Sequence, residues 1–249
     1  VAESNEGNNT AFDSISIVRA DLDVRAVSGP ASTSPGGSFN VSNTVRNIGT
    51  AAAGAFRVGI YLSPDNVCTT TDTLLASRNL ASLGVGLSST ANTPVVIPGS
   101  TALGTRHLCV IVDDQSVVAE SSEANNTRST PINVLSAIPV VNLKVNGIDG
   151  AAVNTTGPYQ LTLDIAPTTY TASLDWYWAI VVNGSLQWVT SGGLSTVPAP
   201  LLSAPPAPVT NLTLLNTNFP VGTSITNVFL LLNGGTTVSS DLVSTTVVP

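Results

Sequence analysis

Short stretches in which apolar and polar residues alternate recur along this chain at intervals of about 8 to 12 residues. These stretches are rich in Val, Ile, Thr and Leu, and clusters of Gly, Pro, Asn and Ser separate them. Residues two apart in a strand share a face, so the alternation predicts half-buried β-strands, whereas helical periodicity is scarce. We therefore expect an all-β protein built from antiparallel sheets.

The first half of the chain holds enough predicted strands for one immunoglobulin-like sandwich, which has seven. The predicted strands are residues 20–28, 38–47, 57–63, 74–80, 88–97, 106–113 and 130–135. Asn43 interrupts the apolar face of the second strand. The stretch after that strand, Asn47 to Thr50, has the composition of a turn in which Gly49 can adopt a positive φ.

A change of composition at residues 135–140, where Ala-Ile-Pro follows the last of these strands, predicts a domain boundary. We expect two tandem immunoglobulin-like β-sandwich domains, residues 19–136 and 137–249, preceded by an N-terminal strand segment, residues 1–18. The second block contains a bridge, residues 197–208, with five prolines. Proline has no N–H to donate, so this bridge is expected at an edge or on the surface rather than as a central strand.

Charge and chemistry exclude several classes of function. The net charge is −7 and only 9% of residues are charged, which argues against binding of nucleic acid or of anionic membranes. No apolar run is long enough to span a membrane. Because no nucleophile elbow, phosphate loop, HExxH or Cys-x-x-Cys motif is present, we expect no catalytic residue, no metal, no cofactor and no enzymatic activity.

The two cysteines, Cys68 and Cys109, are the right number for a single disulfide. Such a bond would close a loop of about 40 residues and stabilise the fold by roughly 4 kcal/mol in the chain-entropy model. The alternative is a pair of buried thiols. His107 lies two residues before Cys109 and shares its face, but a Cys-His nucleophile needs a free thiolate.

The chain starts with Val1 and without a basic, apolar leader, so we expect a processed end or a fragment boundary there. Asn-x-Ser/Thr sequons fit an exported chain and are possible glycosylation sites. They begin at Asn8, Asn40, Asn125, Asn154, Asn183 and Asn211.

All three tryptophans, Trp176, Trp178 and Trp188, lie in the second block. Trp176 and Trp178 are two apart and project to the same face of one predicted strand. Two interpretations are open: the rings belong to the core, or they form a platform on which a sugar stacks.

A phrase of ten residues occurs twice. The chain opens with VAESNEGNNT and repeats it as VAESSEANNT, residues 118–127. The second copy falls where the chain must reverse between its last two strands, and Asn125 and Asn126 suit such a turn. Its acids, Glu120 and Glu123, together with Asp113 and Asp114 upstream, could form a calcium site. The simpler interpretation is a solvated turn whose acceptors are satisfied by backbone N–H groups.

Several stretches follow one another in order along residues 20–134. They are ADLDVRAVSGPAS, SPGGSFNVSNTVRNIGT, FRVGIYLSPD, TDTLLAS, ASLGVGLSST, IPGS and HLCVIVDDQSVVAESSEANNTRSTPINV. Through these stretches, residues 20–134 resemble a bacterial cell-adhesion-related domain, CARDB, an immunoglobulin-like module of exported proteins. Residues 138–249 are similar to a C-terminal β-sandwich of secreted Gram-negative bacterial proteins, through NGIDG, DWYW and FPVGTSITNVFLLLNG. Relatives often carry Asp-rich loops where this chain has NGGTTVSSD, so a cation site is not implied here.

The N-terminal segment reads as the last turn and strand of a domain of the first block's kind. VAESNEGNNTAFDSISIV lines up with VAESSEANNTRSTPINV if one inserted residue is allowed. A last strand without its sheet has unpaired N–H and C=O groups beside an apolar stripe, Phe12, Ile15 and Ile17, and such a strand seeks a partner.

We therefore expect an extracellular or cell-surface structural or adhesive protein, a filament subunit that assembles head to tail through its N-terminal strand. Its partners would be other copies of itself, or neighbouring domains of one array, and a surface or glycan ligand is possible. The alternatives are a fragment of a longer adhesin or stalk, and a carbohydrate-binding module.

Overall fold

The structure, a computed structural model, describes residues 2, 4–8, 11–150 and 152–249. Apart from one 3-10 turn, η1 (Glu6–Asn8), the regular elements in these residues are all strands. The predicted all-β, immunoglobulin-like fold is confirmed. Within the same residues, no helix is long and apolar enough to cross a membrane.

The chain divides into two compact units. The first comprises Val1–Pro30, Ser38–Val96 and Arg106–Ile132, and the second comprises Ala31–Gly37, Ile97–Thr105 and Asn133–Pro249. The change from one unit to the next after Ile132 lies close to the boundary predicted at residues 135–140. The two short segments that group with the second unit could not be assigned from composition.

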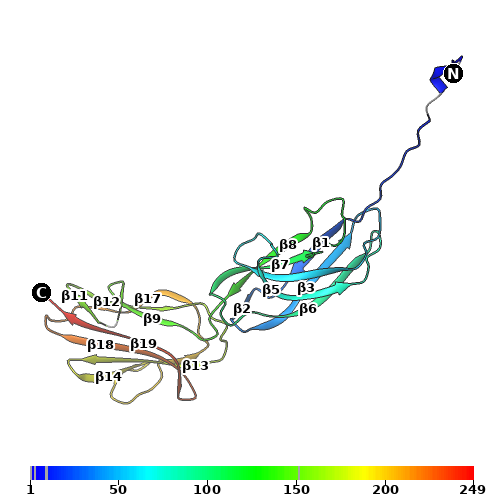
Figure 1. Ribbon diagram of the computed structural model, residues 1–249. Coiled ribbons are helices and arrows are strands. Elements are labelled where there is room, and N and C mark those ends of the chain that lie inside the picture. Colours follow the sequence, from blue (N-terminus) through cyan, green and yellow to red (C-terminus); the bar gives the residue numbers. More distant parts are fainter. Residues whose placement is uncertain (1, 3, 9–10, 151) are drawn as a thin grey trace. The chain divides into compact units, whose positions relative to one another are not determined.

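Two sheets form the first sandwich, with orders β1-β3-β6 and β2-β8-β7-β4-β5 (Figure 1). The strands are β1 (Leu22–Ser28), β2 (Ser32–Thr33), β3 (Ser38–Asn47), β4 (Phe56–Ser63), β5 (Thr73–Leu80), β6 (Ser88–Val96), β7 (Gly104–Val112) and β8 (Thr127–Val134). All seven predicted strands are present, with ends shifted by at most a few residues. The additional strand, β2, pairs in parallel with the end of β8 and is too short to show alternation.

Asn43 interrupts the apolar face of β3 but is nevertheless fully buried. Its amide donates to Thr93 Oγ1 at 3.1 Å and to the Val41 carbonyl, and its Oδ1 accepts from Arg78 Nε at 2.8 Å. Arg78 comes from β5, in the opposite sheet, and also bonds Ser89; burial lowers the pKa of this guanidinium. The apparent error in the sequence pattern is therefore a satisfied polar contact between the sheets.

Gly49 is needed for close approach and not, as predicted, for a positive φ. It is absent from the positive-φ glycines, and a Cβ at this position would lie 2.5 Å from both the Arg19 carbonyl oxygen and the Asp21 nitrogen. The turn is organised by Asn47, which accepts from the Asp21 and Gly49 N–H groups and donates to the carbonyls of Ala51 and Leu83. This turn presses directly on the chain that enters β1.

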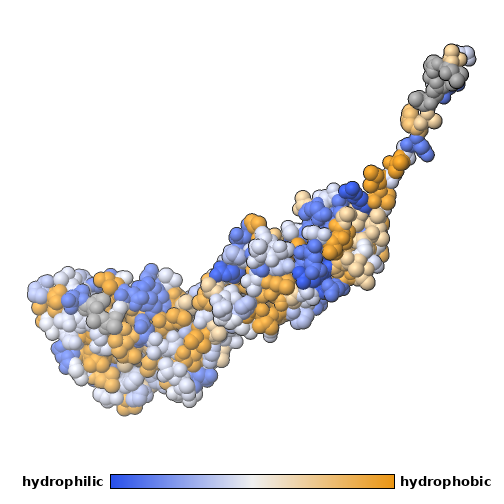
Figure 2. All heavy atoms as spheres, viewed as in Figure 1, coloured by the Kyte–Doolittle hydropathy of each residue, from blue (hydrophilic) through white to orange (hydrophobic). Residues whose placement is uncertain are grey.

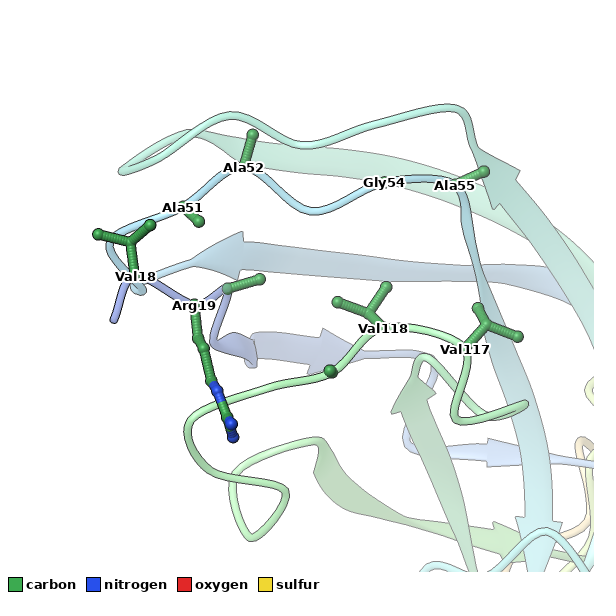
Figure 3. Close-up of a pocket in the computed structure, with 10 residues that line it drawn as sticks. Val18, Arg19, Ala51, Ala52, Gly54, Ala55, Val117 and Val118 are labelled. Atoms are coloured by element: carbon green, nitrogen blue, oxygen red, sulfur yellow. The ribbon is translucent and has the colours of Figure 1, made fainter. Parts of the chain in front are cut away.

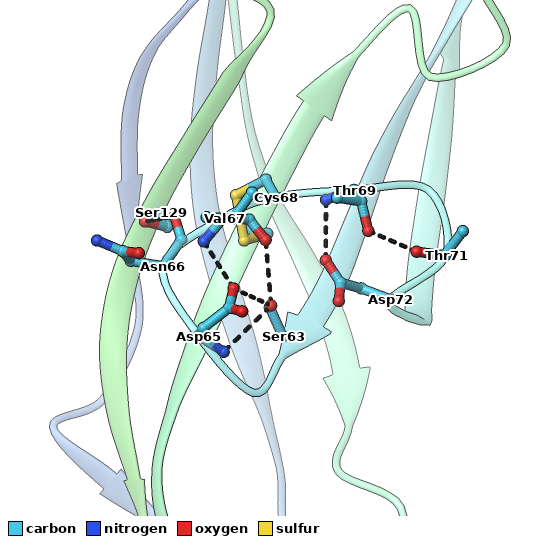
Figure 4. The surroundings of a disulfide bond; sticks show 10 residues. Ser63, Asp65, Asn66, Val67, Cys68, Thr69, Thr71, Asp72 and Ser129 are labelled. Carbon is cyan, nitrogen blue, oxygen red and sulfur yellow. Dashed lines mark hydrogen bonds between the residues drawn. A yellow bond between two sulfur atoms is a disulfide. The ribbon is translucent and has the colours of Figure 1, made fainter.

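Cys68 and Cys109 form the predicted disulfide, with Cα atoms 5.5 Å apart. The bond ties the loop after β4 to β7 and lies over a small cluster that includes Tyr61 and Ile111. Figure 4 shows how polar groups shape the loop: the Val67 N–H donates to Asp65 Oδ1, and Ser63 Oγ donates to the Val67 carbonyl. The loop thus covers apolar side chains on the outer face of β4 and β7.

The second sandwich is also built from two sheets, with orders β10-β9-β12-β17 and β11-β19-β18-β13-β14-β15; β16 pairs with β13. Its strands are β9 (Val141–Val145), β10 (Ile148–Asp149), β11 (Ala152–Thr155), β12 (Tyr159–Ile165), β13 (Leu174–Val182), β14 (Ser185–Thr190), β15 (Gly193–Ser195), β16 (Leu202–Ala204), β17 (Val209–Thr217), β18 (Ser224–Asn233) and β19 (Thr236–Val247). The proline-rich bridge contains only the three-residue β16.

A polar residue also sits at the centre of the second core. Asn227 is fully buried; its amide donates to Tyr159 Oη at 2.6 Å and its Oδ1 accepts from Trp178 Nε1 at 3.0 Å. Burial raises the pKa of Tyr159. Asn227 therefore satisfies two aromatic side chains that would otherwise lose their hydrogen-bond partners inside an apolar core.

Replacing Cys68 and Cys109 together by alanine is expected to lower the free energy of unfolding by about 2 to 4 kcal/mol, because the unfolded chain regains the freedom that the closed loop denies it. Urea unfolding followed by fluorescence measures the change. The wild-type chain unfolded with reductant is the matched control, since it loses the bond without a cavity at Cys109. An unchanged urea midpoint in both samples would contradict this role.

Candidate functional site

The second copy of the repeated phrase, residues 118–127, holds the start of the first strand of its own sandwich. The Ser121 N–H donates to the Ala20 carbonyl at 2.9 Å, and Ala20 and Glu120 form a parallel β-bridge. The Leu22 N–H donates to Glu120 Oε2. Main chain and carboxylate together therefore complete the hydrogen bonds of residues 20–22 before β1 pairs with β3.

Side chains extend the same contact. Both oxygens of Asp21 accept hydrogen bonds at 2.7 Å, one from Ser121 Oγ and one from Asn125 Nδ2. We call this set, Glu120, Ser121 and Asn125 on Ala20 to Leu22, the clasp. It joins the loop before the last strand to the start of the first strand.

Asn126 supports the clasp from behind. It is buried, and its Nδ2 donates to Glu120 Oε1 at 3.1 Å and to Glu123 Oε2 at 3.0 Å. Its carbonyl accepts from the Val112 N–H at 2.9 Å, at the end of β7. The two neighbouring asparagines therefore have different roles. Asn125 bonds Asp21 at the start of β1, and Asn126 bonds Glu120 and Glu123 within its own loop.

The two aspartates upstream anchor the beginning of the loop. Asp113 is buried, and its carboxylate accepts from the N–H groups of Val117 and Val118. Asp114 accepts from Arg57 Nε at 2.8 Å and Nη2 at 2.9 Å, and from Tyr61 Oη at 2.6 Å. Burial, together with the hydrogen bond to Asp114, raises the pKa of Tyr61 to about 12.

The idea of a solvated turn needs correction, because Asp113 and Glu120 are 3% and 6% exposed. The calcium alternative has no support from the geometry either. Each of the four acids is engaged by N–H or hydroxyl donors, Glu120 and Glu123 sharing Asn126. In the described part of the chain no three His, Cys, Asp or Glu side chains gather as a cation site would require. The acids of the phrase hold the loop together.

Glu120 is a buried carboxyl within the clasp. Burial raises its pKa to about 7, against the opposing effect of the hydrogen bonds from Leu22 N–H and Asn126, which favour the charged form. The clasp therefore contains a group that titrates near neutral pH.

The described end of the N-terminal segment, residues 11–18, forms no strand and pairs with no strand of the structure. Phe12, Ile15 and Ile17 are 98%, 89% and 79% exposed. Figure 2 shows hydrophobic residues, in orange, along this segment. Unpaired backbone and exposed apolar side chains therefore occur together, as the sequence predicts for a strand without a sheet.

The segment has a structural counterpart within the same chain. When the register of the two phrases is continued past their ends without an inserted residue, Ile15 and Ile17 fall at the positions of Ile132 and Val134 on β8. Those two side chains are 1% and 0% exposed. The same pattern is therefore buried where a sheet surrounds it and exposed where none does.

A shallow hollow of about 460 Å³ lies where the N-terminal segment joins the first sandwich. Figure 3 shows that Ala51, Ala52, Gly54 and Ala55 line it along one loop and Val117 and Val118 along another, with Val18 and Arg19 at the chain entry. Its walls are formed mainly by small apolar side chains and offer no catalytic group.

The sugar-stacking hypothesis is wrong for Trp176 and Trp178, which are 8% and 6% exposed and belong to the second core. Their indole N–H groups are used inside the protein, by the Ala204 carbonyl and by Asn227. Trp188 is half-buried and meets Tyr177 edge to face at 5.9 Å between ring centroids. Alternation along β13 could not tell which face is covered, because each face of that strand carries apolar residues.

The disulfide also excludes the Cys-His nucleophile, because Cys109 has no free thiol. Among the sequons, Asn40, Asn154, Asn183 and Asn211 are exposed, whereas Asn125 is half-buried and its amide is engaged in the clasp. Asn8 is exposed too, although Thr10 of its sequon lies outside the described residues. Glycosylation stays a prediction.

Sequence reasoning missed the clasp itself. The signal was available: Asp21 is an acid beside the strand start, and the repeated phrase supplies Ser and Asn donors. Only the fold shows that these segments, about a hundred residues apart in the chain, meet.

The model of the CARDB family matches residues 19–130. These residues form a CARDB domain. The predicted resemblance is thereby confirmed, and the clasp lies within the CARDB domain, while residues 1–18 lie outside the match. CARDB is a family of non-catalytic cell-surface domains. The resemblance of residues 138–249 to a second sandwich family stays a prediction.

Solved structures similar to the chain include other CARDB domains. A Pyrococcus furiosus CARDB domain, in complex with di-metal ions, is 22% identical over 51% of this chain and 100% of its own, with a TM-score of 0.38. A domain of a Methanosarcina acetivorans protein, described as a cell surface protein, is 20% identical over 47% of this chain and 93% of its own, with a TM-score of 0.37. The IG1 and IG2 domains of DIP-gamma are 12% identical over 92% and 98%, with a TM-score of 0.36. Among curated proteins, none matches the chain.

Stability should depend on pH through the clasp. The pKa of Glu120 in the folded protein lies above its ordinary value of 4.5, so the folded state binds this proton more tightly than the unfolded chain does. Its contribution is complete below the ordinary pKa and is lost as the pH rises through about 7. We expect the free energy of unfolding to fall between pH 5 and pH 8, and Glu120→Gln to flatten that slope.

Urea unfolding at several pH values provides the measurement. Glu123→Gln is the matched control, because its carboxylate bonds the same Asn126 but is exposed. If Glu120→Gln and Glu123→Gln show the same slope as the wild type, the clasp carries no titrating group.

Proposed function

We propose that this chain is a non-enzymatic, extracellular or cell-surface structural protein whose copies assemble head to tail, each contributing its N-terminal segment as a strand to a neighbour. The observation that carries the proposal is the exposure of Ile15 and Ile17, 89% and 79%, against 1% and 0% for Ile132 and Val134 at the matching positions of β8. Strand addition satisfies backbone groups and apolar side chains together.

Burial of the exposed apolar side chains would contribute to association. Burying an isoleucine side chain contributes roughly 1.5 to 3 kcal/mol, and the segment presents Phe12 in addition to Ile15 and Ile17. A head-to-tail interface between unlike surfaces propagates into an open fibre unless its rotation closes a ring. Val18 lines the hollow at the chain entry, so a neighbouring sandwich that holds residues 11–17 would end close to it.

A non-enzymatic role agrees with the chemistry of the described residues. The CARDB family is non-catalytic, the disulfide occupies both cysteines, and the acids near the phrase are engaged by structural donors. These groups serve the fold and leave assembly through surfaces as the function that the chain supports best.

A second candidate is a longer chain in which residues 1–18 complete a preceding CARDB-like sandwich. The clasp favours this candidate. Ser4 and Asn8 of the first phrase match Ser121 and Asn125, and they could donate to an aspartate at the start of a preceding domain's first strand, as Ser121 and Asn125 donate to Asp21. Intact-mass analysis and N-terminal sequencing of native material separate the two. A mass well above 25.3 kDa supports the longer array.

Replacing Ile15 and Ile17 together by aspartate is expected to abolish assembly, because charged side chains cannot be buried against a neighbouring core. Sedimentation and negative-stain electron microscopy of the full chain measure the polymer. The matched control is the double change of Ser14 and Ser16 to aspartate, which adds the same charge to the other face of the strand.

Deleting residues 1–18 should likewise leave a folded monomer, since the described part of that segment pairs with no strand of the structure. Polymers formed by the deleted chain, or by the chain with aspartate at both isoleucine positions, would refute the proposal.

A further inference from the structure

Strand β17 leaves one edge of the second sandwich open. It is the last strand of its sheet and pairs only with β12. In the part of the chain that the structure describes, its one further main-chain bond is from the Asn211 N–H to Asp164 Oδ1, at 2.5 Å. The sequence VTNLTLLNT contains no charged residue, proline or glycine. It therefore lacks the usual side-chain devices that keep an edge strand from pairing.

The core side of this edge is also uncovered. Leu212 lies opposite Leu163, and residues directly opposite in an antiparallel pair project to the same face. Leu163 is 1% exposed, whereas Leu212 is 46% exposed. Leu215, opposite the fully buried Leu161, is half-buried. The inner face of the sheet thus ends with leucines that still reach solvent.

The missing neighbour has a cause in the sequence. The segment that precedes β17 is the proline-rich bridge, residues 197–208, which cannot supply a continuous row of N–H donors. Its only strand, β16, pairs with β13 in the other sheet. The chain therefore passes from the sheet that contains β13 directly to β17 in the other sheet. No strand of the bridge pairs with the outer side of β17.

Other edges are better protected. Strand β1 carries Asp23 and Arg25, β6 contains Pro94, and β15 has only three residues. Strand β5 carries Arg78, which turns inward to Asn43 and Ser89. On β17, the features that would discourage pairing with another strand are limited to two irregularities in its register with β12.

We propose that β17 of one copy accepts residues 11–18 of the next copy as an added strand, with Ile15 and Ile17 covering Leu212 and Leu215. This inference rests on head-to-tail assembly as the proposed function and names the accepting surface. The place equivalent to β8 in the first sandwich is already filled in every copy by Ile132 and Val134, so the acceptor must be another edge. Eight donor residues span roughly 26 Å, close to the roughly 30 Å of the nine-residue β17.

The polarity of the polymer follows from this pairing. The donor lies at the start of the chain and the acceptor in the second unit, so each copy offers one surface of each kind. Such a heterologous contact repeats from copy to copy and gives an open, polar fibre when its rotation does not close a ring.

Leu212→Lys in the full chain tests the acceptor. A lysine on an edge strand discourages pairing, and we expect the concentration needed for polymer formation to rise about tenfold or more. Leu242→Lys is the matched control: Leu242 is 43% exposed and lies on β19, in the other sheet. It should assemble as the wild type does. Circular dichroism of both variants confirms folding.

Cysteine crosslinking tests the same contact directly, because the described residues contain no free cysteine. Ser16→Cys and Thr213→Cys, each facing away from the core in the proposed pairing, are placed in separate copies and mixed under mild oxidation. A reducible dimer is expected. With the exposed Ser88→Cys on β6 in place of Thr213→Cys, none should form.

The two proposals fail differently. If removal of residues 1–18 prevents assembly but Leu212→Lys polymerises normally and no crosslink to Thr213→Cys forms, the β17 acceptor is wrong and strand donation stands. If the chain without residues 1–18 still polymerises, strand donation itself is wrong and the acceptor falls with it.

Discussion

The clasp between the repeated phrase and the start of β1 is the contact on which the first sandwich depends. It brings a loop near the end of the domain to the residues that begin it, through the Leu22 N–H on Glu120 and the two donors on Asp21. A sandwich whose first and last strands lie in different sheets needs such a link, because nothing in the ladders themselves joins those strands. Glu120 provides it from a buried position, where burial opposes ionisation of the carboxyl and the hydrogen bonds from Leu22 N–H and Asn126 favour it.

The N-terminal segment can be compared with β8, which follows the second copy of the phrase. Its sequence contains the phrase and the alternating strand, yet residues 11–18 pair with no sheet in this structure. On β8 an equivalent strand is buried on its inner face. The second sandwich presents the reverse situation, because β17 has a sheet but no neighbour. A chain with one unpaired strand and one unpaired edge is suited to repeated assembly.

Much of the fold could be predicted from local pattern. The seven strands of the first sandwich, the disulfide between Cys68 and Cys109 and the position of the proline-rich bridge follow from alternation, cysteine count and the missing N–H of proline. Three details could not. Asn43 and Asn227 look out of place in apolar strands until their partners in the opposite sheet are known. Gly49 was predicted to need a positive φ, whereas the approach of Arg19 and Asp21 requires its small size.

The sequence by itself determined that this is an all-β chain of sandwiches with one disulfide and with a strand-like segment at its start, because those properties depend on spacing along the chain. Only the tertiary structure decided that Trp176 and Trp178 are core residues, that the acids of the phrase hold a loop together, and that β17 is an open edge. These features depend on which segments meet across the sandwich. Burial and hydrogen bonding between residues distant in sequence are set by that meeting, and a period of two along a strand is the same for a covered face and an exposed one.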